Sequence, residues 1–314
     1  MKYDESQIIL LKKVSDYIND VEKKGIDSSS SSLCYFPTWT NDPGLLKLKL
    51  WIYGYKNIFS YIKIFIRNLL SVAKYSKFNI IFSGKPHNYK KIILSFSTKN
   101  SFQNDGSFTD RLLNINSKDN QKILWFLVSS DNYIPTNLDK NICVLIRQKD
   151  TLLNYFFFFI KKILKNLFLF KFNIIKFMHQ ILCDSIYAKI VSYNFINLLK
   201  KNNISLIFMP YEGQPFNNCV IKETKNFDKE IKIVGYHSAI PPLPTNMIYR
   251  EGAPDKLIIS GYDQYFYLSH FLNWGKDKLK ILPSLRYKHS KKIINSNMVY
   301  LPYVIFNINK VLIL

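Results

Sequence analysis

Glycine is scarce in this sequence, and the glycine-rich motifs that bind nucleotides are absent. Only 10 of the 314 residues are glycine, which is about 3% against an average of about 7%. The chain contains no GxxxxGK[ST] phosphate-binding loop, no GxGxxG dinucleotide fingerprint and no GxSxG nucleophile elbow. These absences argue against a kinase, a dehydrogenase with the usual fingerprint, and a hydrolase of the nucleophile-elbow type.

Cysteine is also sparse, and its spacing suits neither disulfide nor metal chemistry. Cys34, Cys143, Cys183 and Cys219 form no CxxC pair, and each lies in or near an apolar run. Such cysteines are typical of buried, reduced thiols in a cytosolic protein. The histidines have no partners at metal-ligand spacing, so we expect neither a metal site nor a cofactor.

The chain lacks the long apolar segments that secretion or membrane insertion requires. The N-terminal stretch MKYDESQIILLKKVSDYINDVEKK has a helical pattern but no apolar core of signal-peptide length. Within residues 152–182 the longest uninterrupted apolar piece, Tyr155–Ile160, is far shorter than the ~20 residues that span a bilayer. Lysines interrupt the rest, so this region forms either core-facing helices or a segment lying on the inner membrane leaflet. We expect a cytoplasmic protein, with peripheral membrane contact as the open alternative.

Acidic residues are half as numerous as basic ones, 22 against 44, which gives a formal net charge of +22. This excess permits attraction to an anionic membrane surface. The basic residues are scattered, however, and lysine greatly outnumbers arginine, whereas a base-reading surface favours arginine. An A/T-rich codon bias explains abundant Lys, Asn, Ile, Phe and Tyr equally well. A nucleic-acid partner is therefore not expected.

Short apolar runs alternate with helical patterns over most of the chain. The runs that predict strands are Lys90–Thr98, Gln121–Ser130, Lys140–Gln148, Ile204–Pro210, Ile231–His237, Asp255–Gly261 and Leu279–Ser284. Helical patterns occupy about residues 151–202, 216–226 and the stretch YDQYFYLSHFLNWG. Strands that alternate with helices indicate an α/β fold with a doubly wound, mostly parallel, Rossmann-like sheet. Residues 1–85 read instead as a helical accessory region with a serine-rich loop, and residues 86–290 as the α/β domain.

Polar side chains gather where the later predicted strands end. They are Glu212 and Gln214, His237 and Ser238, Gly261, and Ser284 with Arg286. In a parallel sheet these strand ends share one edge, beyond which ligands bind. A carboxylate or imidazole there can act as a general base, and an arginine can hold a phosphate or carboxylate.

Each of these residues also has a purely structural interpretation. Glu212 is placed to cap the helix that follows, where acids are favoured and Pro215 suits the first position. His237 is equally compatible with a satisfied, partly buried histidine, and Arg286 with a surface cation. The sequence leaves these alternatives open.

The segments YEGQPFNNCVIKE, IKIVGYHSAIPP and PDKLIISGYDQYFYLSHFLNWGKDKLKILPSLRY together resemble bacterial surface carbohydrate (O-antigen-type) biosynthesis proteins related to GT-B glycosyltransferases. The resemblance covers residues 204–287 well and residues 90–203 in outline, and Phe216-Asn217 departs from the aromatic–acid pair expected there. It implies that residues 86–290 are the acceptor-side domain of a GT-B-like fold. It further implies that residues 291–314 are a linker and the first strand of a second, truncated domain.

The resemblance predicts a glycosyltransferase that moves sugar from a nucleotide-sugar to a lipid-linked or other glycan acceptor, this chain being an incomplete form and inactive alone. Glu212 or His237 is the expected base, while Gln214, Ser238, Gly261, Ser284 and Arg286 are expected to bind substrate. Two alternatives stay open: a nucleotide-sugar epimerase-like enzyme on the same fold, and a non-catalytic basic protein that binds membranes.

Overall fold

The computed structural model describes residues 5–31, 34, 77–82, 89–148, 183–237 and 245–282. The strands are β1 Lys77–Phe82, β2 Lys91–Ser97, β3 Thr109–Asp110, β4 Ile115–Asn116, β5 Ile123–Ser129, β6 Ile142–Gln148, β7 Leu206–Pro210, β8 Lys232–His237, β9 Lys256–Ile259 and β10 Leu279–Ile281. The α-helices within these ranges are α1 Glu5–Lys23, α6 Cys183–Leu199, α7 Pro215–Phe227 and α8 Tyr262–Phe271. All seven predicted strands are confirmed, with slightly shorter bounds.

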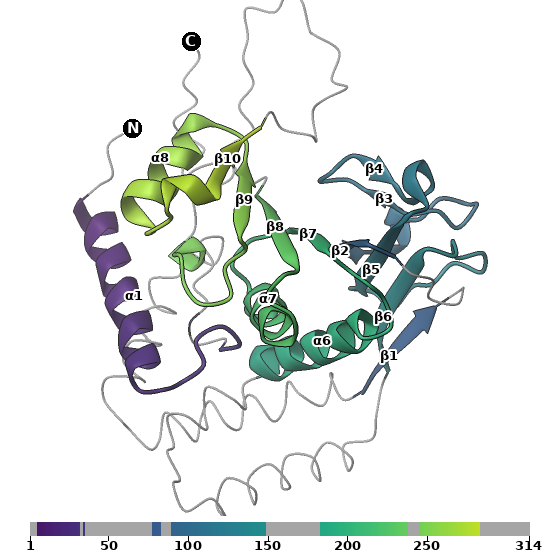
Figure 1. Cartoon of the computed structure of the whole chain (residues 1–314), viewed down its shortest axis with the longest axis horizontal. Coiled ribbons are helices and arrows are strands. Elements are labelled where there is room, and N and C mark those ends of the chain that lie inside the picture. Colours follow the sequence, from purple (N-terminus) through teal and green to yellow (C-terminus); the bar gives the residue numbers. More distant parts are fainter. Residues whose placement is uncertain are drawn as a thin grey trace, which may run out of the picture.

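One eight-stranded sheet organises the molecule, in the order β1-β6-β5-β2-β7-β8-β9-β10 (Figure 1). β1 runs antiparallel to β6, and the other strands are all parallel to their neighbours. The predicted α/β class and mostly parallel sheet are therefore confirmed. From β2 the chain builds outward through β5 to β6, returns to β7 on the other side of β2, and continues to β10. This reversal is the doubly wound order, and its switch point lies between β2 and β7.

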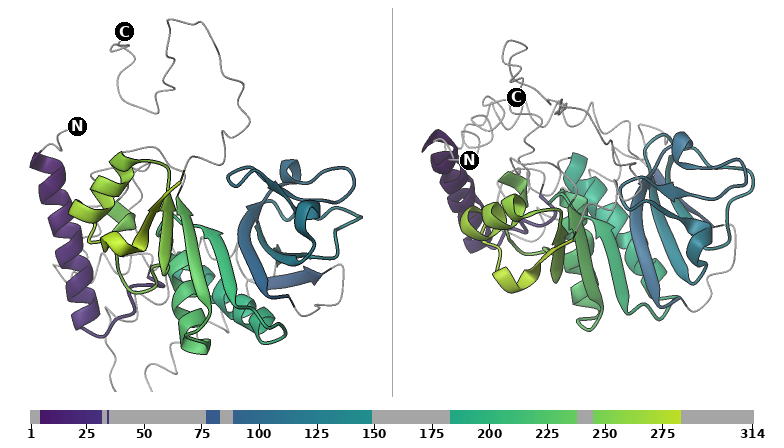
Figure 2. Two further views of the ribbon diagram at one scale, coloured as in Figure 1. Left: turned by 45° about the horizontal axis from the view of Figure 1, so that its top comes forward. Right: turned by 90° about the horizontal axis from the view of Figure 1, so that it is seen from above.

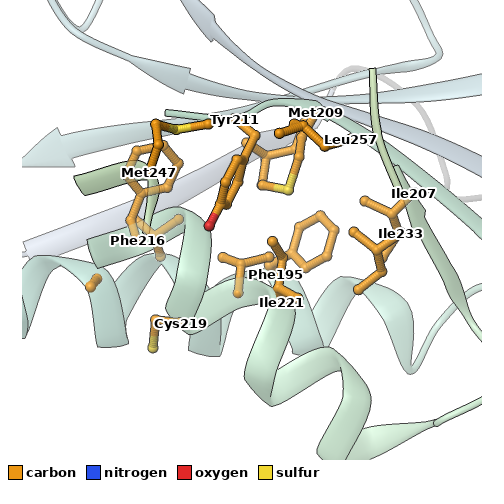
Figure 3. Close-up of a cluster of buried hydrophobic side chains, with 14 of the residues drawn as sticks. Phe195, Ile207, Met209, Tyr211, Phe216, Cys219, Ile221, Ile233, Met247 and Leu257 are labelled. Atoms are coloured by element: carbon orange, nitrogen blue, oxygen red, sulfur yellow. The ribbon is translucent and has the colours of Figure 1, made fainter. Parts of the chain in front are cut away.

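The face of the sheet that carries the helices holds the larger hydrophobic core. Side chains of α1, α6, α7 and α8 pack there against the alternate residues of the strands. Figure 3 shows Phe195 of α6 beside Ile207, Ile233 and Leu257 of three neighbouring strands. Phe195 is fully buried, and its ring meets Phe126 of β5 edge to face at 5.2 Å. Burial of apolar side chains between helices and sheet therefore fixes this layer.

The opposite face is covered differently over β2, β5 and β6. The connection from β2 to β5 supplies the short β3–β4 pair and two 3-10 turns in place of a helix. Phe108 and Leu113 from this connection pack against Trp125 and Leu127 of β5. Asp110 fastens it, because its buried carboxylate accepts hydrogen bonds from the Ser95 hydroxyl of β2 and the Leu113 N–H. A compact irregular segment thus does here what a crossover helix does in most doubly wound sheets.

The described parts of the N-terminal region, helix α1 and strand β1, pack onto or pair with the sheet. Residues 1–85 were predicted to be a helical accessory region, and β1, whose six residues pair with β6, was missed. Helix α1 was predicted correctly, and its Val14, Ile18 and Val21 lie in the main core. Figure 2 shows α1 beside α8 at one end of the sheet, with β3 and β4 at the other end.

The serine-rich loop after α1 is buried rather than solvated. Ser28, Ser29, Ser30 and Ser31 are each at most 2% exposed. Asp27 organises them, since its carboxylate accepts hydrogen bonds from the Ser29 backbone and hydroxyl and from the Ser30 hydroxyl. Lys222 of α7 completes the cluster with an Asp27 contact of 3.0 Å and a Glu251 contact of 2.8 Å.

Several predictions fall outside the described residues. They are the part of the predicted helical accessory region at residues 35–76, the aromatic and lysine-rich stretch at 152–182, and the linker and strand at 291–314. Among the helices that are described, none has the length and apolar character needed to cross a membrane. Cys34, Cys143 and Cys219 are buried, and none of the three forms a disulfide, as their apolar surroundings predicted.

Truncating Phe195 tests the main core. Phe195→Ala removes a fully buried ring between α6 and the sheet, so we expect a loss of about 3–5 kcal/mol in the free energy of unfolding by urea. Tyr193→Ala on the same helix is the matched control, because Tyr193 is 69% exposed. A loss of equal size in both variants would contradict the assigned face of α6.

The Asp27 cluster predicts a specific pH dependence. Burial alone would raise the pKa of Asp27, but hydrogen bonds from Ser29, Ser30 and Lys222 and the Lys222 charge lower it from 3.8 to about 2. The unfolded chain therefore binds more protons between these values, and this stabilisation is present above pH 4 and is lost as pH falls toward 2. Asp27→Asn should lower the unfolding free energy at pH 6, and this difference should shrink below pH 4. Asp16→Asn, at an exposed position of α1, should change neither.

Candidate functional site

The candidate site lies at the edge of the sheet where the parallel strands end, at the switch point between β2 and β7. β2 pairs with β5 along its whole length to Ser97, but it pairs with β7 only as far as Ile93 and Phe208. The ladder between β2 and β7 therefore stops before either strand does. Phe96, 37% exposed at the end of β2, meets Phe216 of α7 edge to face at 5.2 Å. Ligands of doubly wound sheets bind at such a point.

The turn Glu212–Gly213–Gln214 joins β7 to α7 at this switch point. Gly213 has a φ of +64°, and a Cβ there would lie 2.1 Å from the Asn246 carbonyl oxygen, so only glycine fits this conformation and this close approach. Pro215 occupies the first helical position, as predicted. The Asn246 side-chain amide donates to the Glu212 carbonyl oxygen. The turn is consequently fixed by a hydrogen bond from the segment that follows β8.

Glu212 does not cap α7. The N-cap residue is Gln214, it makes no side-chain capping bond, and the first turn holds no acidic residue. The Glu212 side chain is exposed, and its Oε2 accepts a hydrogen bond of 2.9 Å from the Gln214 Nε2. The structure therefore does not show the capping role that the sequence also allowed for Glu212. A carboxylate oriented by a neighbouring amide and open to solvent is free to accept a proton from a bound hydroxyl.

His237 lies at the end of β8, next to the turn, and is 1% exposed. Its Nδ1 lies 3.0 Å from the Tyr211 carbonyl oxygen, and because a carbonyl only accepts, Nδ1 carries the proton. Nε2 is then a buried lone pair, and no group in the described ranges hydrogen-bonds to it. Burial lowers the pKa of His237 from 6.5 to about 4, against the opposing effect of the Tyr211 bond. The imidazole is therefore neutral at physiological pH and is a weaker base than an ordinary histidine.

Of the seven predicted site residues, the structure brings Glu212, Gln214 and His237 together around Tyr211. Gly261 lies two residues beyond the end of β9, on the same edge of the sheet, and is the N-cap of α8, with open space where a Cβ would stand. The remaining three predicted residues, Ser238, Ser284 and Arg286, lie outside the described residues.

The sequence did not point to Arg250, which contacts the turn through the Gly213 carbonyl oxygen. The Arg250 guanidinium donates to the carbonyl oxygens of Cys34 and Gly213, the latter at 3.1 Å. It is 5% exposed. Its sequence context, MIYREG, carries no motif, and the available signal was only that it is one of five arginines among many lysines.

Within the described ranges no group of three or more His, Cys, Asp or Glu residues could hold a metal ion. Comparisons of the chain with family models, with curated proteins and with solved structures find no significant match.

The state of His237 can be measured directly. Its ring should stay neutral from pH 8 to pH 5, so its nuclear magnetic resonance signals should not shift in this range, whereas an ordinary imidazole titrates near 6.5. His237→Asn, which keeps a donor toward the Tyr211 carbonyl, identifies the signal by its loss. Between pH 6.5 and 4 the unfolded chain binds the extra proton, so acidification should destabilise the wild type more than this variant. A midpoint near 6.5 for the assigned signal would refute the burial described above.

Proposed function

We propose that the chain provides the acceptor-side, Rossmann-like domain of a GT-B-like glycosyltransferase of cell-surface polysaccharide synthesis. The observation that carries this proposal is the position of the Glu212–Gln214 turn at the switch point of a doubly wound sheet. The resemblance of the segments around it to O-antigen-type biosynthesis proteins gives the class of reaction. In this proposal a sugar moves from a nucleotide-sugar to a hydroxyl of a glycan acceptor.

In this reaction Glu212 is the base on the acceptor hydroxyl. Its carboxylate is exposed and is oriented by Gln214, so it can reach a proton that a bound sugar presents. The oxygen of that hydroxyl forms the new glycosidic bond as the bond from the sugar to the nucleoside diphosphate breaks, and Glu212 takes the proton. His237 suits this role less well, because its imidazole is buried. We assign His237 to positioning, through its bond to the Tyr211 carbonyl.

The two sequence-based alternatives predict different products. An epimerase would convert the nucleotide-sugar without an acceptor, whereas a transferase requires one. If the protein is non-catalytic and binds anionic surfaces through its charge, that binding does not depend on Glu212.

A transfer assay with matched variants tests this proposal. Because this chain is expected to be inactive alone, it is incubated together with a donor-side GT-B domain, with radiolabelled UDP-, GDP- and dTDP-sugars and with lipid-linked saccharides, and label in the saccharide fraction is counted. We expect Glu212→Gln to reduce transfer by about 10²–10⁴-fold, because the amide keeps the shape but cannot accept the proton. Glu230→Gln is the control, since Glu230 is an exposed residue of the turn before β8, at the opposite edge of the sheet.

Two results would overturn the proposal. One is conversion of a nucleotide-sugar that needs no acceptor, which would indicate the epimerase-like reaction. The other is transfer that Glu212→Gln leaves at the wild-type rate while the protein stays folded, which would remove Glu212 from the chemistry.

A further inference from the structure

The N-terminus of α7 is electrostatically uncompensated. The first N–H groups of a helix have no partners within the helix, and the aligned peptide dipoles place a partial positive charge there. Helix α7 has 13 residues, no side-chain capping bond and no acid in its first turn. The Gln214 amide, which occupies the N-cap position, donates instead to Glu212.

A buried cation adds to this positive end. Among the described residues the Arg250 guanidinium donates only to the neutral carbonyl oxygens of Cys34 and Gly213, and its Nε has no partner there. None of the ion pairs among the described residues involves Arg250. Because Gly213 immediately precedes the N-cap, the guanidinium lies against the same turn as the helix end. A buried charge without a counter-ion is costly, so this arrangement favours an anion.

The one acidic residue of the turn does not supply that anion. Glu212 makes its side-chain bond to Gln214, and it forms no ion pair with Arg250 among those described. By contrast, Lys222 further along α7 contacts both Asp27 and Glu251. Within the described part of the chain, acids therefore neutralise the cation on the body of the helix, Lys222, but none neutralises Arg250 at its beginning.

Two buried acceptors next to this turn also have no partner among the residues that the structure describes. They are the Asn246 Oδ1, whose own amide donates to the Glu212 carbonyl, and the His237 Nε2. Buried polar atoms in native proteins are nearly always paired with protein, water or a ligand. An acceptor requires a donor, and the hydroxyls of a sugar are donors of this kind. The surroundings of the turn therefore combine positive groups for an anion with acceptors for hydroxyls.

We propose that the N-terminus of α7, the turn Tyr211–Gln214 and Arg250 form a binding site for the phosphate of a phosphorylated sugar. The phosphate takes as donors the guanidinium and the N–H groups of Phe216 and Asn217, since Pro215, the first residue of α7, has no N–H. Sugar hydroxyls lie toward Asn246 and His237. Solvent reaches the site at Glu212, which is exposed, whereas the Arg250 side chain of the site is buried. The site follows from charge and hydrogen bonding and does not require the chain to transfer sugars.

A pair of variants that differ only in charge tests the site. Gln214→Asp places a carboxylate at the N-cap, where it caps α7 and occupies the position of the ligand's anion. Gln214→Asn has the same shape without the charge. By isothermal titration calorimetry with glucose 1-phosphate, we expect Gln214→Asp to bind at least tenfold more weakly than Gln214→Asn. Without ligand, Gln214→Asp should unfold at a higher temperature than the wild type, which a damaged fold would not do.

Further probes separate the parts of the ligand. Inorganic phosphate should bind more weakly than glucose 1-phosphate, because it lacks the sugar hydroxyls. Glucose should bind more weakly still, because it lacks the phosphate. UDP-glucose and farnesyl phosphate-linked glucose represent the two sources of a sugar phosphate, and tighter binding of either one identifies the source. Arg250→Gln should also lose binding; if it does not fold, the Gln214 pair decides.

Three results would overturn this site. They are no saturable binding of any phosphate probe, equal binding by Gln214→Asp and Gln214→Asn, and an equal loss in Lys232→Gln. Lys232 is an exposed lysine at the beginning of β8, on the opposite edge of the sheet. A loss there would show that the probes respond only to the overall charge of +22.

Discussion

The pairing of β2 with β7 is the constraint on which the rest of the structure depends. It joins the two halves of the sheet, and it is formed by only three residue pairs at the beginning of the strands. Beyond Ile93 and Phe208 the two strands are no longer paired, while β2 stays paired to β5 and β7 to β8 up to their ends. The polar turn after β7 therefore stands where the sheet divides, and the chemistry proposed for Glu212 depends on that position.

The two faces of the sheet are covered by different kinds of structure beside this edge. Helices fill the face that holds α7, so the loop after β7 has to bend into a helix within a few residues, and Gly213 permits this. On the other face an irregular connection is held to β2 by the Asp110 carboxylate. On the helical face the N-terminus of α7 lies at the switch point. On the opposite face the irregular connection packs against β2 and β5. A positive helix end at the division of the sheet is the result.

The strands and the fold class could be predicted because each buried strand is a short, nearly continuous apolar run, which is a local signal. β1 could not, because it falls at the end of a region with a helical pattern and is defined only by pairing with the distant β6. The serine run was correctly predicted to be a loop, but its burial depends on Asp27 and on Lys222 from another element. In the site, Glu212 and Gln214 were found from their place after a strand. Arg250 was missed because it contacts Gly213 only through the fold.

The sequence by itself determined the alternation of strands and helices, the location of the polar strand ends, and the glycine and proline that shape the turn before α7. Periodicity and backbone preference are properties of neighbouring residues, and they act before the chain folds. Only the tertiary structure decided that Glu212 leaves α7 uncapped, that His237 is buried and neutral, and that Arg250 lies under the turn. Burial and charge compensation depend on groups brought together from distant parts of the chain, and no local pattern encodes them.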